Sequence, residues 1–167
     1  MTITNVLKFE TNDDVKLLDA RGPRFGAVIT TLVLAGILAT ESLALLSWQL
    51  AVFALGAFLG PQATPYAWIY RTLIKPRLRG DVPTEDTRPP QFAQVVGFLF
   101  ALTAFFALVL DVFLIFEIAI GFALGAAFLN AAFNFCLGCE MYLLIARVRK
   151  SFINASNRHY FEHLPEL

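Results

Sequence analysis

Residues 25–60 read FGAVITTLVLAGILATESLALLSWQLAVFALGAFLG and hold two apolar runs separated only by Glu41 and Ser42. A run of roughly 18 or more apolar residues is long enough to cross the hydrocarbon of a bilayer as a helix. The run 25–40 is slightly short for this, and the run 43–60 is sufficient. This stretch therefore predicts two membrane helices joined by a tight turn.

Two more apolar segments follow, at residues 91–110 and 118–146. The chain of 167 residues is 57% hydrophobic and contains 17 phenylalanines, which is far more apolar than a soluble domain. The four segments predict an all-α fold, a polytopic membrane bundle of four helices. Because about 20 residues cross the hydrocarbon, the last segment is too long for one perpendicular span. Three arrangements are open: the segment tilts, it extends beyond the bilayer, or Val112–Phe116 lies along the outer interface.

The basic residues predict the orientation of the bundle. The 13 Lys and Arg residues fall into three groups, four before the first span, five between the second and third, and four after the last. The two remaining turns carry only Glu41 and Asp111 as charged residues. Basic loops stay in the cytoplasm, so we expect cytoplasmic tails at 1–24 and 148–167 around a membrane domain at 25–147. The net charge of zero gives no indication of nucleic-acid binding.

The long loop after the second span contains its own predicted element. Tyr66, Trp68 and Tyr70 lie close to Arg71 and Lys75, and such aromatic and basic mixtures suit the headgroup region. We therefore expect a short interfacial helix over residues 66–74 that stops at Pro76, followed by a polar linker.

The chain has two cysteines, Cys136 and Cys139, and both lie in the fourth predicted span. On a continuous helix, Cys139 and Glu140 share one face with Cys136, near the inner leaflet. A structural disulfide is disfavoured towards the reducing cytoplasm, so the pair suggests a redox centre. Two sulfurs supply half of a tetrahedral metal site, so we assign no metal. The plain alternative is that both cysteines pack as small hydrophobic residues.

Three polar side chains near this pair have their own alternatives. Glu140 is a proton acceptor for a thiol or a snorkelling carboxylate at the interface. Gln94, at a similar depth in the third helix, lines the cysteine site or joins two helices by a hydrogen bond. Asn130 and Asn134 share a face roughly opposite to the cysteines, and we expect them to bond between helices.

Pairs of glycines four residues apart indicate close helix packing in a membrane. Gly56 and Gly60 form one such pair, and Gly121 and Gly125 form the other.

Four motifs resemble a bacterial membrane family called domain of unknown function 4395. They are RGPRF before the first span, GPQATPYAWIYRTLIKPRL after the second, PPQFAQVVG at the third, and FCLGC in the fourth. The resemblance implies a multi-pass protein of the bacterial plasma membrane. It also implies thiol chemistry, with a cytoplasmic thioredoxin-like or sulfurtransferase protein as partner. No cofactor is assigned. Because the chain has no further cysteine, electrons must pass to a partner protein, a quinone or a sulfur compound.

Three functions compete. The first is thiol–disulfide redox or sulfur handling by Cys136 and Cys139, with Glu140 as proton acceptor. The second is a non-catalytic subunit of an oligomer or larger membrane complex, whose cysteines pack or share a metal. The third, a small transporter, is least favoured because the spans show no broken-helix repeats and no intramembrane charge.

Overall fold

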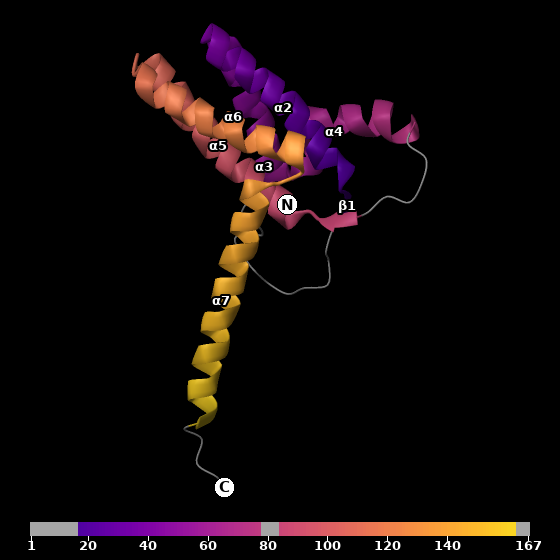
Figure 1. Ribbon diagram of the computed structural model, residues 1–167, viewed down its shortest axis with the longest axis vertical. Helices are drawn as coiled ribbons and strands as arrows, with labels where there is room; N and C mark the ends of the chain where they lie inside the picture. The colour runs from indigo at the N-terminus through magenta and orange to yellow at the C-terminus, as the bar shows by residue number, and fades with distance from the viewer. Residues whose placement is uncertain (1–16, 78–83, 163–167) are drawn as a thin grey trace.

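The computed structural model describes residues 17–77 and 84–162, with the side chains of the last helix described as far as Ser151. It confirms an all-α bundle (Figure 1). The elements in chain order are β1 (Leu17–Asp19), α2 (Arg21–Thr40), α3 (Leu43–Leu59), α4 (Pro65–Ile69), β2 (Thr84–Asp86), α5 (Arg88–Val109), α6 (Phe113–Phe133) and α7 (Leu137–Glu162).

Helices α2, α3, α5 and α6 form the bundle, in which α2 packs on α6 and α5 packs on both α3 and α6. Its core combines large apolar side chains such as Leu34 and Phe116 with alanines, among them Ala104 of α5. Other large apolar side chains face outward, such as Leu32 and Leu114, which are 69% and 67% exposed. Three helices, α2, α5 and α6, are long and apolar enough to cross a membrane, and α3 is a shorter apolar helix of 17 residues.

The continuous fourth helix that we expected over residues 118–146 is wrong. Helix α6 ends at Phe133 and a separate helix, α7, begins at Leu137 and turns away from the bundle (Figure 1). The 21 residues of α6 are about 31 Å long at 1.5 Å per residue, which matches the hydrocarbon thickness. A single span is thus complete before the cysteines are reached.

Asn134 ends α6 by adopting the left-handed conformation, with φ 56° and ψ 28°. Its amide donates to the carbonyl of Asn130 at 3.1 Å, and the amide of Phe135 donates to Leu129 at 3.3 Å. Asparagine tolerates this conformation better than most residues. Asn134 was predicted to bond between helices, and its role as the residue that stops α6 was not predicted.

A helical segment covers the predicted residues 66–74 of the loop after the second span, but it does not stop at Pro76, which lies within its last turn. Helix α4 continues through a π-helical turn at Tyr70–Ile74 and a 3-10 turn at Lys75–Arg77. Two other features were not predicted. Strand β1 and the first turn of α2 occupy part of the expected tail at 1–24, and β2 occupies part of the expected polar linker.

Glycine packing differs from the prediction at three of four positions. A Cβ atom on Gly56 would lie 2.7 Å from the Gln94 side chain, so this glycine does allow close packing. Gly60 has φ 98° and serves a turn, and a Cβ atom on Gly121 or Gly125 would meet nothing within 4 Å.

Two successive units of the chain repeat the same arrangement. The first is β1-α2-α3-α4 and the second is β2-α5-α6-α7. Each begins with the pattern Asp-x-Arg-x-Pro-x-Phe, which is DARGPRF at residues 19–25 and DTRPPQF at residues 86–92. In both, the aspartate Oδ1 accepts the amide of the arginine at 3.0 Å. The repeat was missed in the sequence because only this short pattern marks it.

The pairing of β1 with β2 relates the two units by an approximate two-fold axis. The strands are antiparallel, with Leu18 opposite Glu85 and with Asp19 opposite Thr84. If the two units are exchanged, Leu18 and Glu85 still face each other and the pairs on either side of them change places. This is the register that a two-fold axis between Leu18 and Glu85 requires.

Contacts between the units obey the same axis. Arg24 of α2 donates through Nε to the carbonyl of Ala131 near the end of α6, at 3.2 Å. Gln91, which has the equivalent position in α5, donates through Nε2 to the carbonyl of Ala57 near the end of α3, at 2.9 Å. Each unit thus caps the last turn of a helix in the other, where carbonyl groups lack partners within their own helix.

Candidate functional site

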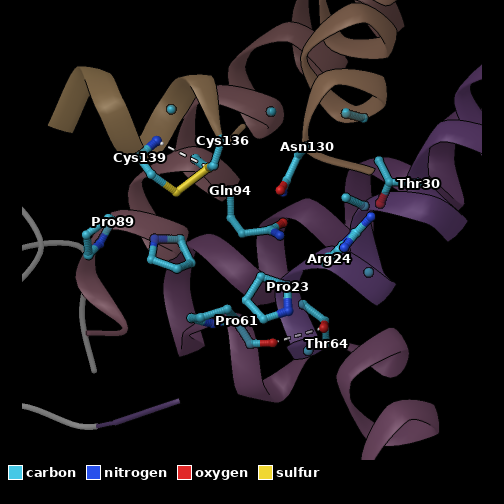
Figure 2. A pocket seen from close by; sticks show the side chains of 18 of the residues that line it. Pro23, Arg24, Thr30, Pro61, Thr64, Pro89, Gln94, Asn130, Cys136 and Cys139 are labelled. Atoms are coloured by element: carbon cyan, nitrogen blue, oxygen red, sulfur yellow. Dashed lines mark hydrogen bonds between the residues drawn. A yellow bond between two sulfur atoms is a disulfide. The ribbon is translucent and has the colours of Figure 1, made fainter. Parts of the chain in front are cut away.

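Cys136 caps the beginning of α7 with its sulfur atom. The Cys139 amide donates to Cys136 Sγ at 3.3 Å, and the Glu140 amide donates to the Cys136 carbonyl at 3.0 Å. These are the bonds that a serine or aspartate makes as the N-cap of a helix. The two sulfurs form a disulfide bond, which Figure 2 shows at one side of a cavity.

Cys136 and Cys139 are neighbours, as predicted, and their sulfurs are bonded. The continuous helix expected to hold them together with Glu140 is not formed, because Cys136 precedes α7 and only the other two residues lie within it. Cys139 occupies the first turn and is half-buried, and Glu140 is exposed. The cysteines lie at the end of the bundle where α2 and α5 begin, which we call the cysteine end.

Gly138, between the cysteines, allows α7 to contact α5 closely. A Cβ atom at this position would lie 2.7 Å from both Cα and Cβ of Ala93. One turn later, the rings of Tyr142 and Phe92 lie 5.8 Å apart between centroids. The position of the disulfide against α5 therefore depends on the absence of a side chain at residue 138.

The first unit has an equivalent of this cap without sulfur. Thr64 is the N-cap of α4, and its Oγ1 accepts the amide of Ala67 at 3.2 Å. The ring of Tyr70 then contacts Phe25 at 5.7 Å, as Tyr142 contacts Phe92. The Cys-x-x-Cys motif therefore occupies a helix start that the fold builds twice.

A cavity of about 790 Å³ lies between the two units at the cysteine end. Both N-caps, Thr64 and Cys136, contribute to its lining. Figure 2 shows the side chains of Gln94, Asn130 and Arg24 directed into the space between the disulfide and Thr64. Asn130 therefore lines the cavity that the disulfide also lines, which corrects the expectation that it points away from the cysteines.

Charged groups of both signs surround the cavity. The cations are Arg24, Arg71 and Lys75, and the carboxylates are Asp19, Glu85, Asp86 and Glu140. With opposite charges in similar number, the lining favours neither an anion nor a cation.

Tyr70 joins β1 to the helical segment that follows α3. Its hydroxyl donates to Asp19 Oδ2 at 3.1 Å. Burial raises the pKa of the Tyr70 phenol above its ordinary value, and the hydrogen bond and negative charge of Asp19 raise it further. The phenol therefore stays protonated and keeps its donor role at physiological pH.

No group of three or more His, Cys, Asp or Glu side chains positioned for a metal ion occurs among residues 17–77 and 84–162. His159 belongs to the part of α7 whose side chains are not described, and His163 lies outside the described residues.

A family model described as a domain of unknown function (DUF4395) matches residues 18–147. The chain belongs to this family. The match includes the FCLGC motif and both Asp-x-Arg-x-Pro-x-Phe patterns, and it ends within α7. No curated protein and no solved structure matches the chain.

Replacing Gly138 with alanine tests the contact between α7 and α5. We expect Gly138→Ala to destabilise the purified protein by about 1–3 kcal/mol, because the new methyl group overpacks against the backbone of Ala93. Thermal unfolding in detergent measures this as a lower midpoint. Gly125→Ala is the matched control, since its methyl group would meet nothing within 4 Å. Equal midpoints for the two variants would contradict the predicted close contact.

Moving the cysteine motif to the first unit tests the internal repeat. We expect the four-fold variant Thr64→Cys, Ala67→Cys, Cys136→Ser and Cys139→Ser to form a disulfide at the start of α4. The reason is that Thr64 already makes the N-cap bond that Cys136 makes in α7. Thiol labelling before and after reduction counts the free cysteines. Two thiols that stay free under an oxidant would show that the two helix starts differ.

Proposed function

We propose that this family member is a multi-pass protein of the bacterial plasma membrane with its cysteine end in the cytoplasm. The described basic residues support this orientation, because they lie on segments at the cysteine end: Arg21, Arg24, Arg71, Lys75, Arg77, Arg88, Arg147, Arg149 and Lys150. The turns at the other end carry Glu41 and Asp111. Basic segments of this kind remain on the cytoplasmic side.

The proposed depth of the disulfide follows from the length of α6. This helix uses its 21 residues to cross the hydrocarbon, so Cys136 and Cys139 follow at the inner interface. At this level a sulfur pair is within reach of both cytoplasmic proteins and molecules dissolved in the lipid.

The function that this geometry supports best is thiol–disulfide exchange by Cys136 and Cys139. The single observation that carries it is the hydrogen bond from the Cys139 amide to Cys136 Sγ at the start of α7. Amide groups and the positive end of a helix dipole stabilise a thiolate at this position. Cys136 is therefore the attacking cysteine in our proposal, and the site has an activating group that a continuous helix would lack.

Exchange proceeds through a mixed disulfide. The Cys136 thiolate attacks a disulfide of the partner, forms a bond to one partner sulfur and releases the other as a thiolate. The Cys139 thiol then loses its proton, attacks Cys136 Sγ and releases the second partner thiol. The partner is reduced by two electrons and the cysteine pair is oxidised. With the disulfide in place, the same steps run in reverse and oxidise a partner dithiol.

Glu140 is the proposed proton acceptor for Cys139. It follows this cysteine directly, is exposed to solvent and lines the same cavity. A carboxylate with access to water takes the proton of the resolving thiol and passes it to solvent.

The proposed partner is a cytoplasmic thioredoxin-like or sulfurtransferase protein. Apolar side chains surround the disulfide on the exposed side, where Phe135, Leu137 and Met141 are 46%, 39% and 47% exposed. Such a surface suits a protein that must bring its own reactive sulfur against Cys136.

Single cysteine variants distinguish the two proposed roles. In cells, Cys139→Ser should accumulate a mixed disulfide with the partner, because Cys136 attacks but nothing resolves the intermediate. Cys136→Ser should accumulate far less, since Cys139 lacks the stabilised thiolate. Non-reducing gels followed by mass spectrometry measure the adduct. Equal adducts in the two variants, or adducts in neither, would count against the proposed exchange by Cys136.

A further inference from the structure

We infer that the cavity beside the disulfide binds a lipid-soluble quinone, which accepts two electrons from the reduced cysteine pair. This inference rests on the proposed thiol–disulfide exchange and adds the class of molecule at the other end of the electron path. Among the described residues, the only two sulfur atoms of cysteine are already paired with each other. A second cysteine pair in the same chain is therefore not available to receive the electrons.

The cavity extends from the disulfide deep into the bundle. Its lining includes Val52 and Phe53 of α3 and Phe100 of α5 as well as Cys136. Phe100 is 12 residues into α5, about 18 Å from the beginning of the helix at 1.5 Å per residue. A cavity that reaches half-way through a membrane bundle suits a ligand that is itself dissolved in the membrane.

An aromatic pair lines the inner part of the cavity. The rings of Phe100 and Phe122 are stacked with their centroids 6.1 Å apart, and both residues line the cavity. Phe122 is also 64% exposed. A planar ring in the cavity therefore has aromatic side chains to pack against.

Polar groups are concentrated at the disulfide end. Gln94 and Asn130 present side-chain amides that donate to a quinone carbonyl or accept from a quinol hydroxyl. Gln94 Oε1 is buried with no hydrogen-bond partner in the described part of the chain. An unpaired buried acceptor costs free energy that a nearby donor recovers. A quinol hydroxyl is a donor of the kind that this acceptor lacks.

The charges at the cavity favour a neutral ligand. Arg24, Arg71 and Lys75 are balanced by carboxylates in the same lining, so an anionic sulfur compound gains no net attraction. The cavity of about 790 Å³ combines apolar side chains with charges of both signs, and its volume is in the range of sites for small ring compounds.

The electron transfer balances without another reactant. The thiols of Cys136 and Cys139 form one S–S bond and lose two electrons and two protons. The quinone gains both electrons and both protons and leaves as the quinol. The partner dithiol of the proposed function then reduces the disulfide, so each cycle oxidises one partner dithiol and reduces one quinone.

The test uses the purified full-length chain, reduced and freed of reductant, in nanodiscs. The probe is a short-tail benzoquinone whose ring carbons are all substituted, so that thiols cannot add to the ring. We expect loss of quinone absorbance with loss of both thiols. Ala126→Phe, which places a ring in the cavity, should slow this reaction about ten-fold or more because the quinone cannot reach the sulfurs.

Two controls make the result specific. Ala132→Phe adds the same ring to an exposed position of α6 outside the cavity lining and should react like the original chain. Exchange of the reduced pair with an excess of oxidised glutathione should be equal in all three proteins. If exchange occurs but the quinone oxidises none of them, or oxidises all equally, the quinone site is disproved and the exchange function stands. If exchange also fails, the proposed function is disproved as well.

Discussion

Where the proposed chemistry of this protein takes place depends on how the length of helix α6 compares with the thickness of a bilayer. Helix α6 has 21 residues and stops at a left-handed asparagine, so a helix long enough to cross a bilayer is complete before the chain reaches Cys136. The next helix, α7, then begins at Leu137, and the sulfur of the preceding Cys136 accepts the amide of Cys139. A continuous helix would have satisfied that amide with a backbone carbonyl, so the sulfur would have had no amide to stabilise a thiolate.

The internal repeat explains why the site lies between two halves of the molecule. Each unit supplies two bundle helices and one further helix that starts at the same end, and Arg24 and Gln91 link the units at equivalent carbonyls. The cavity lies where the two units meet, as ligand sites do in other membrane proteins built from repeats. Only the second unit carries sulfur, while Thr64 makes the corresponding cap in the first. The two-fold arrangement therefore serves as a scaffold for one asymmetric site.

Much of the bundle could be predicted from composition and hydropathy. The apolar runs located α2, α3 and α5 to within a few residues, because long uninterrupted apolar helices leave a strong signal. The break at Asn134 was missed, since the residues around it are as apolar as a membrane helix and a single asparagine is a weak stop signal. The position of Asn130 on the same cavity as the cysteines depends on how helices pack, which a single sequence does not encode locally. The repeat had a visible signal in DARGPRF and DTRPPQF, but two short patterns gain meaning only when the strands are seen to pair.

The most direct test is the accessibility of the cysteine pair from each side of the membrane. A membrane-impermeant maleimide is applied to right-side-out and inverted vesicles, before and after reduction, and labelling at Cys136 and Cys139 is read by mass spectrometry. A redox pair at the cytoplasmic boundary predicts labelling in inverted vesicles only, and only after reduction. Labelling from the outer side, or no labelling on either side once reduced, would contradict a cytoplasmic thiol site at the end of the bundle.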